Sequence, residues 1–314
     1  MTSPAPGEAP LPDAGRNWVD DHAPDRLKPW LKLGRFDRPI GIWLLLLPGW
    51  QGIALALAAD RRPPDLYDLW LIVGFALGAC LMRAAGCAYN DIVDRDVDAR
   101  VARTAGRPIP SGRISVKQAW GFLIGCSLVS FLILLTLPPV AIGLGIGSLG
   151  LVAAYPFMKR ITWWPQAWLG LTFNWGALMG FAAAGGDIWT AALLLYASGV
   201  FWTLGYDTIY ALQDIEDDAL VGVKSSARRL GRSVRSGVGV FYVLAVALMG
   251  GAVATGGLGA AAWGGLAGMA LHLAWQVARL RPNDGAGALR LFKSNRQTGI
   301  LSLIALILGA ARPA

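Results

Sequence analysis

Two short segments carry acidic side chains at helical spacing, and nine of the 20 Asp and Glu residues fall within them. In each segment, oxygen-bearing side chains recur three or four residues apart, which places them on one face of a helix. The two sets are Asn90, Asp94 and Asp98 in the first segment and Asp207, Tyr210, Asp214 and Asp218 in the second. Carboxylates one turn apart repel each other, so each face requires a compensating cation.

The residue types around these faces favour a site for magnesium and diphosphate. Oxygen ligands without His or Cys are typical of Mg²⁺, which keeps part of its water and binds substrate phosphate. A basic loop follows each segment, with Arg103 and Arg107 after the first and Lys224 after the second, and these cations could bind the remaining diphosphate oxygens. The alternatives are solvated helix ends and ordinary cytoplasmic loop charge. The pairing of acids with bases favours the site.

The elements that must position these residues are membrane helices. Of the 314 residues, 55% are hydrophobic and 15% charged, whereas a soluble domain carries about a quarter charged residues. Uncharged runs of about 20 residues predict helices that cross a bilayer. We therefore expect an all-α fold, a polytopic membrane bundle of about nine transmembrane helices within the lipid bilayer. The predicted spans are 39–59, 69–89, 118–158 divided at Pro138 and Pro139, 161–186, 188–212, 236–278 divided at 250–259, and 297–311.

The distribution of charge predicts the orientation. Lys and Arg concentrate on alternate loops, so the N-terminus and both acidic segments are expected on the cytoplasmic side. The net charge of +8 has the same origin, and we expect no nucleic-acid partner. A multi-pass protein of a bacterial inner membrane is expected, with a mitochondrial membrane as the alternative.

The chain divides unevenly between a tail and a membrane domain. Residues 1–30 mix Pro, Gly and acidic residues and are expected to form a disordered cytoplasmic tail, whereas 31–314 should form a single transmembrane domain. Asp94 is as far from Asp214 as Asp98 is from Asp218. This equal separation predicts two similar halves, with motifs at 90–98 and 207–218.

The apolar remainder of the chain indicates what kind of molecule carries the diphosphate. A headgroup site at the end of a helix bundle favours a lipid such as a polyprenyl diphosphate. Mg²⁺ would neutralise the leaving diphosphate while the allylic carbon becomes positive. Intramembrane carboxylates are also typical of cation-coupled transporters, but transporter sites usually lie near the bilayer midplane. An enzyme is therefore favoured over a transporter or a non-catalytic scaffold.

The two acidic segments resemble the aspartate motifs of the UbiA family of intramembrane aromatic prenyltransferases. NDIVDRDVD at 90–98 resembles NDxxDxxxD, and DIEDD at 214–218 resembles DxxxD. The resemblance continues over nearly all of the chain after residue 30. Within the family, LMRAAGCAYND, YPFMKRITWWPQAWLG and FKSNRQTG are most similar to the branch that transfers a polyprenyl group to 4-hydroxybenzoate, ortho to its hydroxyl, in ubiquinone synthesis. Another aromatic acceptor is the alternative.

The resemblance also implies a central cavity with a cytoplasmic cap and a set of site residues. Mg²⁺ would be bound by Asn90, Asp94, Asp98, Asp214 and Asp218. Glu216 and Asp217 lie between the last two, so it stays open which carboxylate completes the second set of ligands. Asp207 is the candidate for binding the substrate hydroxyl or accepting the ring proton, and Tyr210 would line the same wall. Arg160 is the first choice for the benzoate carboxylate, with Arg83 and Arg35 in reserve.

Three of these side chains have competing structural interpretations. Arg83 could instead form an ion pair with Asp94 or Asp98, because an intramembrane charge needs a partner. Arg160 could anchor the protein at the membrane interface. Asn174, in the middle of an apolar span, could line the cavity or bind a neighbouring helix.

Overall fold

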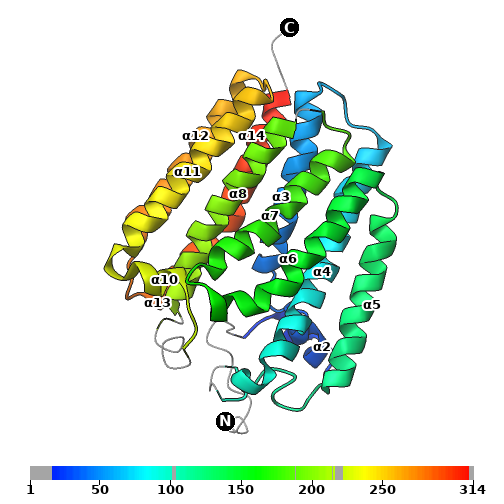
Figure 1. The fold of residues 1–314 in the computed structure, drawn as a ribbon, viewed down its shortest axis with the longest axis vertical. Coiled ribbons are helices and arrows are strands. Elements are labelled where there is room, and N and C mark those ends of the chain that lie inside the picture. Colours follow the sequence, from blue (N-terminus) through cyan, green and yellow to red (C-terminus); the bar gives the residue numbers. More distant parts are fainter. Residues whose placement is uncertain (1–15, 101–103, 188, 214, 216–221, 311–314) are drawn as a thin grey trace. The chain divides into compact units, whose positions relative to one another are not determined.

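The computed structural model is helical, and it describes residues 16–100, 104–187, 189–213, 215 and 222–310 (Figure 1). Every regular element in these ranges is a helix, which confirms the predicted all-α class. The chain forms two compact units. Unit 1 comprises residues up to 42 together with 77–133, and unit 2 comprises 43–76 together with 134–314.

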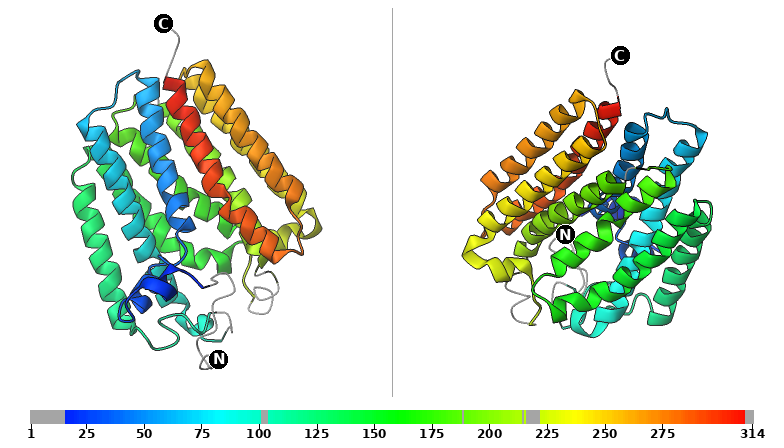
Figure 2. Two further views of the ribbon diagram at one scale, coloured as in Figure 1. Left: turned by 180° about the vertical axis from the view of Figure 1, so that it is seen from behind. Right: turned by 45° about the horizontal axis from the view of Figure 1, so that its top comes forward.

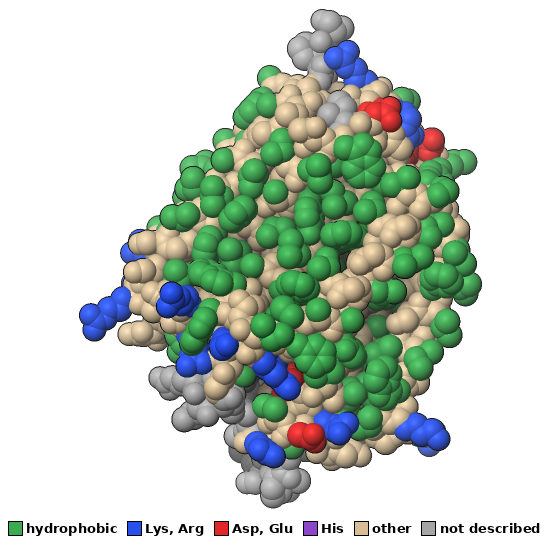
Figure 3. All heavy atoms as spheres, viewed as in Figure 1, with side chains coloured by type: hydrophobic (Ala, Val, Ile, Leu, Met, Phe, Trp, Pro, Cys, Tyr) green, Lys and Arg blue, Asp and Glu red, His purple; other side chains and the backbone are tan. Residues whose placement is uncertain are grey.

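Long apolar helices coincide with the predicted spans. They are α3 Ile40–Ala59, α4 Leu66–Asp98, α5 Val116–Leu134, α6 Pro139–Ile161, α7 Pro165–Ala183, α8 Trp189–Tyr210, α11 Val234–Thr255, α12 Ala260–Arg279 and α14 Asn295–Ala310. In the described part of the chain, five stretches are long and apolar enough to cross a membrane: α3, α4, α5, α6 and Ser226–Thr255. Hydrophobic side chains cover most of the face in Figure 3. A multi-pass membrane protein is confirmed, and the count of nine spans stays a prediction.

Short helices occupy the connections and part of the predicted tail. They are α1 Trp18–His22, α2 Lys28–Leu33, the 3₁₀ turns Ala211–Gln213 and Gly231–Ser233, α10 Ser226–Leu230 and α13 Gly285–Lys293. Asn17 begins α1, since its side chain accepts a hydrogen bond from the Val19 N–H at 3.0 Å. Val19 is fully buried, and Asp20 pairs with Lys32 of α2 at 2.5 Å. Among the described residues, helical structure is therefore present from Trp18, before the boundary predicted at residue 30; residues 1–15 lie outside the described part.

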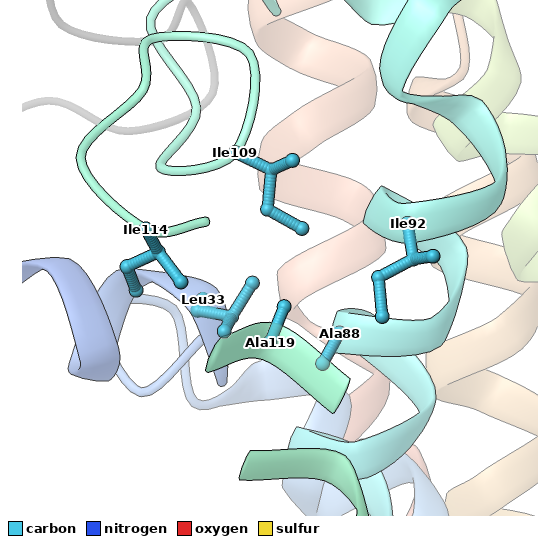
Figure 4. Close-up of a cluster of buried hydrophobic side chains, with 6 residues drawn as sticks. All are labelled: Leu33, Ala88, Ile92, Ile109, Ile114 and Ala119. Atoms are coloured by element: carbon cyan, nitrogen blue, oxygen red, sulfur yellow. The ribbon is translucent and has the colours of Figure 1, made fainter. Parts of the chain in front are cut away.

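A hydrophobic cluster holds the C-terminal end of α4 within unit 1. Figure 4 shows these side chains meeting between α2, α4, α5 and the intervening loop. The buried members are Leu33, Ala88, Ile92, Ile109, Ile114 and Ala119. Ala88 and Ile92 are one turn apart, so their burial fixes the rotation of α4 about its axis and with it the direction of the acidic segment.

Glycines allow two helices of unit 2 to approach closely. The backbone of α3 at Gly49 and Gly52 lies against α7, where Gly176 and Gly180 have the corresponding positions. A Cβ on Gly180 would lie 3.2 Å from the Ile53 nitrogen and 3.1 Å from the Gly49 carbonyl carbon. Small residues four apart, such as Gly176 and Gly180, are a common way for membrane helices to pack without bulky side chains between them. The rest of unit 2 is layered in the order α6, α7, α8, α11, α12 and α14, the last two side by side in Figure 2.

We predict that Gly180→Ala destabilises the protein, because the new methyl group meets backbone atoms that cannot move independently. Overpacking of this kind costs about 1–3 kcal/mol in the free energy of unfolding. Gly147→Ala is the matched control, since nothing lies within 4 Å of a Cβ at that exposed glycine of α6. Thermal unfolding in detergent should show a lower midpoint for Gly180→Ala alone, and equal midpoints for both variants would contradict the close contact.

Candidate active site

The first acidic segment forms the last turns of α4. The helix continues without interruption through Asn90, Asp94 and Asp98, so these three side chains follow one another at successive turns. Asp94 is 1% exposed and Asp98 is also buried, whereas the side chain of Asp96 is 78% exposed. The segment is therefore not a uniformly solvated helix end.

A fourth acid of this segment, Asp91, is fully buried and forms the best-paired carboxylate of unit 1. The Arg35 Nη2 donates to both of its oxygens, at 2.7 and 3.1 Å. Arg35 has a φ of 58°, in the left-handed region that non-glycine residues rarely adopt. A third hydrogen bond of Arg35, from Nη1 to the Lys32 carbonyl at 3.0 Å, helps to hold this conformation. The sequence did not single out Asp91, although it directly follows Asn90.

Arg107 bridges two carboxylates of the same segment. Its Nη1 lies 2.6 Å from Asp98 Oδ2 and 3.4 Å from Asp91 Oδ1. The Thr104 hydroxyl donates to the Asp98 carbonyl at 2.8 Å, which ties the start of the loop to the helix end. Arg107 Nε is buried and has no hydrogen-bond acceptor among the described residues. The structure thus brings Arg107 of the basic loop into contact with Asp98 of the acidic face. Arg103 lies outside the described residues.

The three arginines considered for a substrate carboxylate have different surroundings. Arg83 is half-buried on α4 and its guanidinium lies over Gly41, where a Cβ would be 2.6 Å from Nε. Arg35 is committed to Asp91. Arg160, at the end of α6, is exposed. Of the three, Arg83 is the cation that lies in the interior of an apolar helix.

The second acidic segment begins on α8. Asp207 is half-buried there, one helical turn from the end of α8 at Tyr210. The Tyr210 ring packs on Phe292 of α13, with 4.5 Å between the ring centroids. Tyr206 contacts the same Phe292 ring at 5.8 Å. Asp214 and Asp218, with Glu216 and Asp217, lie outside the described residues.

Hydrogen bonds fasten the loop after this segment to the ends of α6 and α7. The Lys224 backbone N–H donates to the Lys159 carbonyl at 2.9 Å, and Lys224 Nζ to the Ile161 carbonyl at 3.1 Å. The Ser226 N–H donates to the buried Gln166 Oε1 at 3.0 Å. Lys224 is thereby held beside the segment that contains Arg160, which groups two residues that the sequence predicted for the site.

A buried polar network settles the position of Asn174. Its Nδ2 donates to Thr203 Oγ1 at 2.7 Å and to the Gly170 carbonyl at 2.9 Å. Thr203 in turn donates to the Tyr206 hydroxyl at 3.1 Å. Of the two alternatives for Asn174, the structure gives the bond to a neighbouring helix.

A second polar network, which the sequence analysis missed, supports the same side of α8. Gln276 and Asn295 exchange hydrogen bonds at 3.2 Å, and Trp202 donates to Asn295 Oδ1 at 2.8 Å. Asn295 also donates to the carbonyls of Leu291 and Phe292. These contacts set the position of the Phe292 ring against Tyr210. The signal in the sequence that could have predicted this network was the presence of polar residues inside apolar helices.

The donor types of the first segment fit magnesium. Asn90, Asp94 and Asp98 offer only oxygen, as Mg²⁺ prefers, and the buried carboxylates lie beside a guanidinium with an unused donor. Among the described residues, no three His, Cys, Asp or Glu side chains gather closely enough to hold a metal by themselves. The first segment alone is thus an incomplete carboxylate set.

Comparison with known proteins gives consistent matches over most of the chain. The family described as the UbiA prenyltransferase family matches residues 45–310. A 4-hydroxybenzoate polyprenyltransferase of Aedes aegypti, named as mitochondrial, is 44% identical over 317 residues, covering 96% of this chain and 70% of the relative.

Two solved structures share the fold. A UbiA homolog from Aeropyrum pernix K1 superposes with a TM-score of 0.71 at 28% identity, covering 85% of this chain and 97% of the other. A UbiA homolog from Archaeoglobus fulgidus, solved bound to GPP and Mg²⁺, has a TM-score of 0.62 at 17% identity, with 89% and 99% coverage.

We predict that Gln166→Leu loosens the loop that carries Lys224. The substitution leaves the buried Ser226 N–H without its acceptor, which costs about 1–3 kcal/mol. Hydrogen exchange of the 222–230 amides should become faster in this variant. Gln297→Leu, at an exposed position of α14, is the control. Unchanged exchange in Gln166→Leu would show that the loop does not depend on this hydrogen bond.

Proposed function

This chain belongs to the UbiA prenyltransferase family, and from that premise we propose that it transfers a polyprenyl group from polyprenyl diphosphate to 4-hydroxybenzoate. The group is added ortho to the ring hydroxyl, a step of ubiquinone synthesis. The choice of acceptor follows the name of the Aedes aegypti relative, to which nearly the whole chain aligns. The match over 45–310 includes both acidic segments.

The burial of Asp94 is the observation that carries the proposal. A solvated helix end would leave this carboxylate in water, as Asp96 is left two residues later. Withdrawing a carboxylate from water at the end of an apolar helix costs free energy, which favours a functional position over an incidental one. Catalysis that requires a metal gives such a carboxylate a function.

We propose the two acidic segments as the source of the metal ligands and the basic loops as the source of the diphosphate contacts. The ligands are Asn90, Asp94, Asp98, Asp214 and Asp218, and the diphosphate contacts are Arg103, Arg107 and Lys224. When bound, Mg²⁺ supplies positive charge that neutralises the departing diphosphate. Arg107 already lies beside Asp98 and has an unused buried donor, which a diphosphate oxygen would satisfy.

The bond changes define what the remaining side chains must do. The allylic carbon–oxygen bond breaks and its electron pair leaves with the diphosphate. The ring carbon ortho to the hydroxyl then bonds to the allylic carbon and releases its proton. We assign that proton to Asp207, which is half-buried and acidic, and we assign Tyr210 to the wall of the same site.

The benzoate carboxylate requires a cation in an apolar surrounding, and we propose Arg83 for it. Arg160 is exposed and Arg35 binds Asp91, whereas Arg83 is half-buried in the interior of α4. Gly41 leaves room for the Arg83 guanidinium beside the first turn of α3. A guanidinium can bind a carboxylate through two parallel hydrogen bonds.

We also propose that the N-terminus lies in the cytoplasm, as the charge distribution predicts, and that the membrane is a bacterial inner membrane. The Aedes aegypti relative is named as mitochondrial and gives the second part of this proposal no support.

We predict that membranes containing the protein convert radiolabelled 4-hydroxybenzoate and a polyprenyl diphosphate into an organic-soluble product, and that EDTA abolishes the reaction. Asp94→Asn should lower the rate about 100-fold or more, as the loss of a group that stabilises charge in a transition state does. Asp96→Asn removes an exposed carboxylate of the same helix and should retain the rate.

The possible failures have different meanings. Prenylation of a different aromatic acceptor would retain the family chemistry and overturn the substrate. Absence of any product, together with Mg²⁺-dependent uptake of polyprenyl diphosphate into vesicles, would support a transporter instead.

We predict that Arg83→Gln raises the KM for 4-hydroxybenzoate about 10- to 100-fold, because a charged hydrogen bond of about 1.5–3 kcal/mol is lost. The KM for a neutral acceptor, 4-hydroxybenzamide, should change much less. Arg160→Gln is the matched comparison, since it removes an equal charge from an exposed position. An equal rise in KM for both acceptors would contradict binding of the carboxylate by Arg83. A rise in the KM for 4-hydroxybenzoate that is confined to Arg160→Gln would assign carboxylate binding to Arg160.

A further inference from the structure

Asp91 is held by two arginines and does not belong to the residues proposed as metal ligands. Its carboxylate is fully buried, accepts two hydrogen bonds from Arg35 and contacts Arg107 at 3.4 Å. The same Arg107 nitrogen is 2.6 Å from Asp98. One guanidinium nitrogen is therefore shared between a proposed metal ligand and a neighbouring carboxylate.

This sharing creates a competition at Asp98. Arg107 neutralises the Asp98 carboxylate in the structure, and a divalent cation that binds Asp98 through Oδ2 must replace that contact. A guanidinium displaced from its partner within a buried region needs another negative charge nearby. Asp91 supplies this charge, since its Oδ1 already contacts the same nitrogen.

We propose that Asp91 is a positioning residue that receives Arg107 when a divalent cation takes over Asp98. Retained by Asp91, Arg107 stays beside the metal ligands and can offer its unused Nε to a diphosphate oxygen. The proposal deepens the proposed function and rests on it for the identity of the metal and diphosphate. Arg35 completes the arrangement, because its guanidinium holds the Asp91 carboxylate in place.

The test measures binding of Mn²⁺ by the purified protein in detergent and detects it by electron paramagnetic resonance. Mn²⁺ prefers the same oxygen ligands as Mg²⁺ and gives a direct signal without any reaction. Arg107→Gln removes the competitor and should tighten Mn²⁺ binding. Asp91→Asn leaves Arg107 with Asp98 as its carboxylate and should weaken Mn²⁺ binding about tenfold, within the coupling range of contacting side chains.

The double variant Asp91→Asn/Arg107→Gln separates positioning from a general structural role. If Asp91 acts through Arg107, its loss no longer matters once Arg107 is gone, and the double variant should bind Mn²⁺ as Arg107→Gln does. Additive effects of the two substitutions would overturn the proposal. Asp96→Asn, on the exposed side of the same helix, should leave Mn²⁺ binding unchanged.

A second pair of measurements covers the case in which Asp91→Asn fails to fold because Arg35 loses its partner. In an Arg35→Gln background the substitution Asp91→Asn leaves two neutral side chains. Mn²⁺ binding is compared in this background for Asp91→Asn with and without Arg107→Gln. Binding of radiolabelled pyrophosphate at saturating Mg²⁺ should fall in both Arg107→Gln and Asp91→Asn. Unchanged pyrophosphate binding would overturn the role given to Arg107.

The result can be told apart from a failure of the proposed function. Transfer to 4-hydroxybenzoate is assayed in the same wild-type preparation. Coupled Mn²⁺ binding without transfer would retain the role of Asp91 and overturn the reaction, whereas transfer with additive Mn²⁺ effects would retain the reaction and overturn the role of Asp91.

Discussion

The neutralisation of buried charge is the constraint on which the first acidic segment depends. Three carboxylates lie out of water at the end of α4, where an unpaired charge would be costly. Arg35 pairs with Asp91, and Arg107 pairs with Asp98. These two arginines come from a loop before α3 and a loop after α4, so the ion pairs also hold both loops to the helix end.

Apolar packing gives these ion pairs their geometry. The cluster around Ala88 and Ile92 sets the rotation of α4, and the acidic residues on the neighbouring faces follow from it (Figure 4). The same loop that contributes Ile109 to the cluster contributes Arg107 to the carboxylates. Hydrophobic burial thus positions the charged side chains, and the ion pairs between them offset the cost of removing them from water.

Neutral polar groups meet the same requirement between several helices of unit 2. Asn174, Thr203 and Tyr206 satisfy one another between α7 and α8, and Gln276 and Asn295 do so farther along the chain. In an apolar bundle each unsatisfied polar group is costly, so these side chains fix which helices can be neighbours. Both networks end near Tyr206 and Tyr210, the region in which the proposed reaction needs a rigid wall.

The sequence alone determined the features that depend on local periodicity. Runs of apolar residues predicted the long helices, and the four-residue interval placed Asn90, Asp94 and Asp98 on successive turns because helical geometry is the same in every protein. Helix α1 was missed, since its order depends on the burial of Val19 and on the contact between Asp20 and Lys32.

Only the tertiary structure decided which residues are partners. Arg35 meets Asp91 across 56 positions of the chain, and Asn174 meets Thr203 across 29. Neither pair follows from spacing, because the approach of segments that are distant in the sequence depends on how all their side chains pack. The sequence therefore specified which residues carry the chemistry, and the packing of the helices decided which arginine each carboxylate holds.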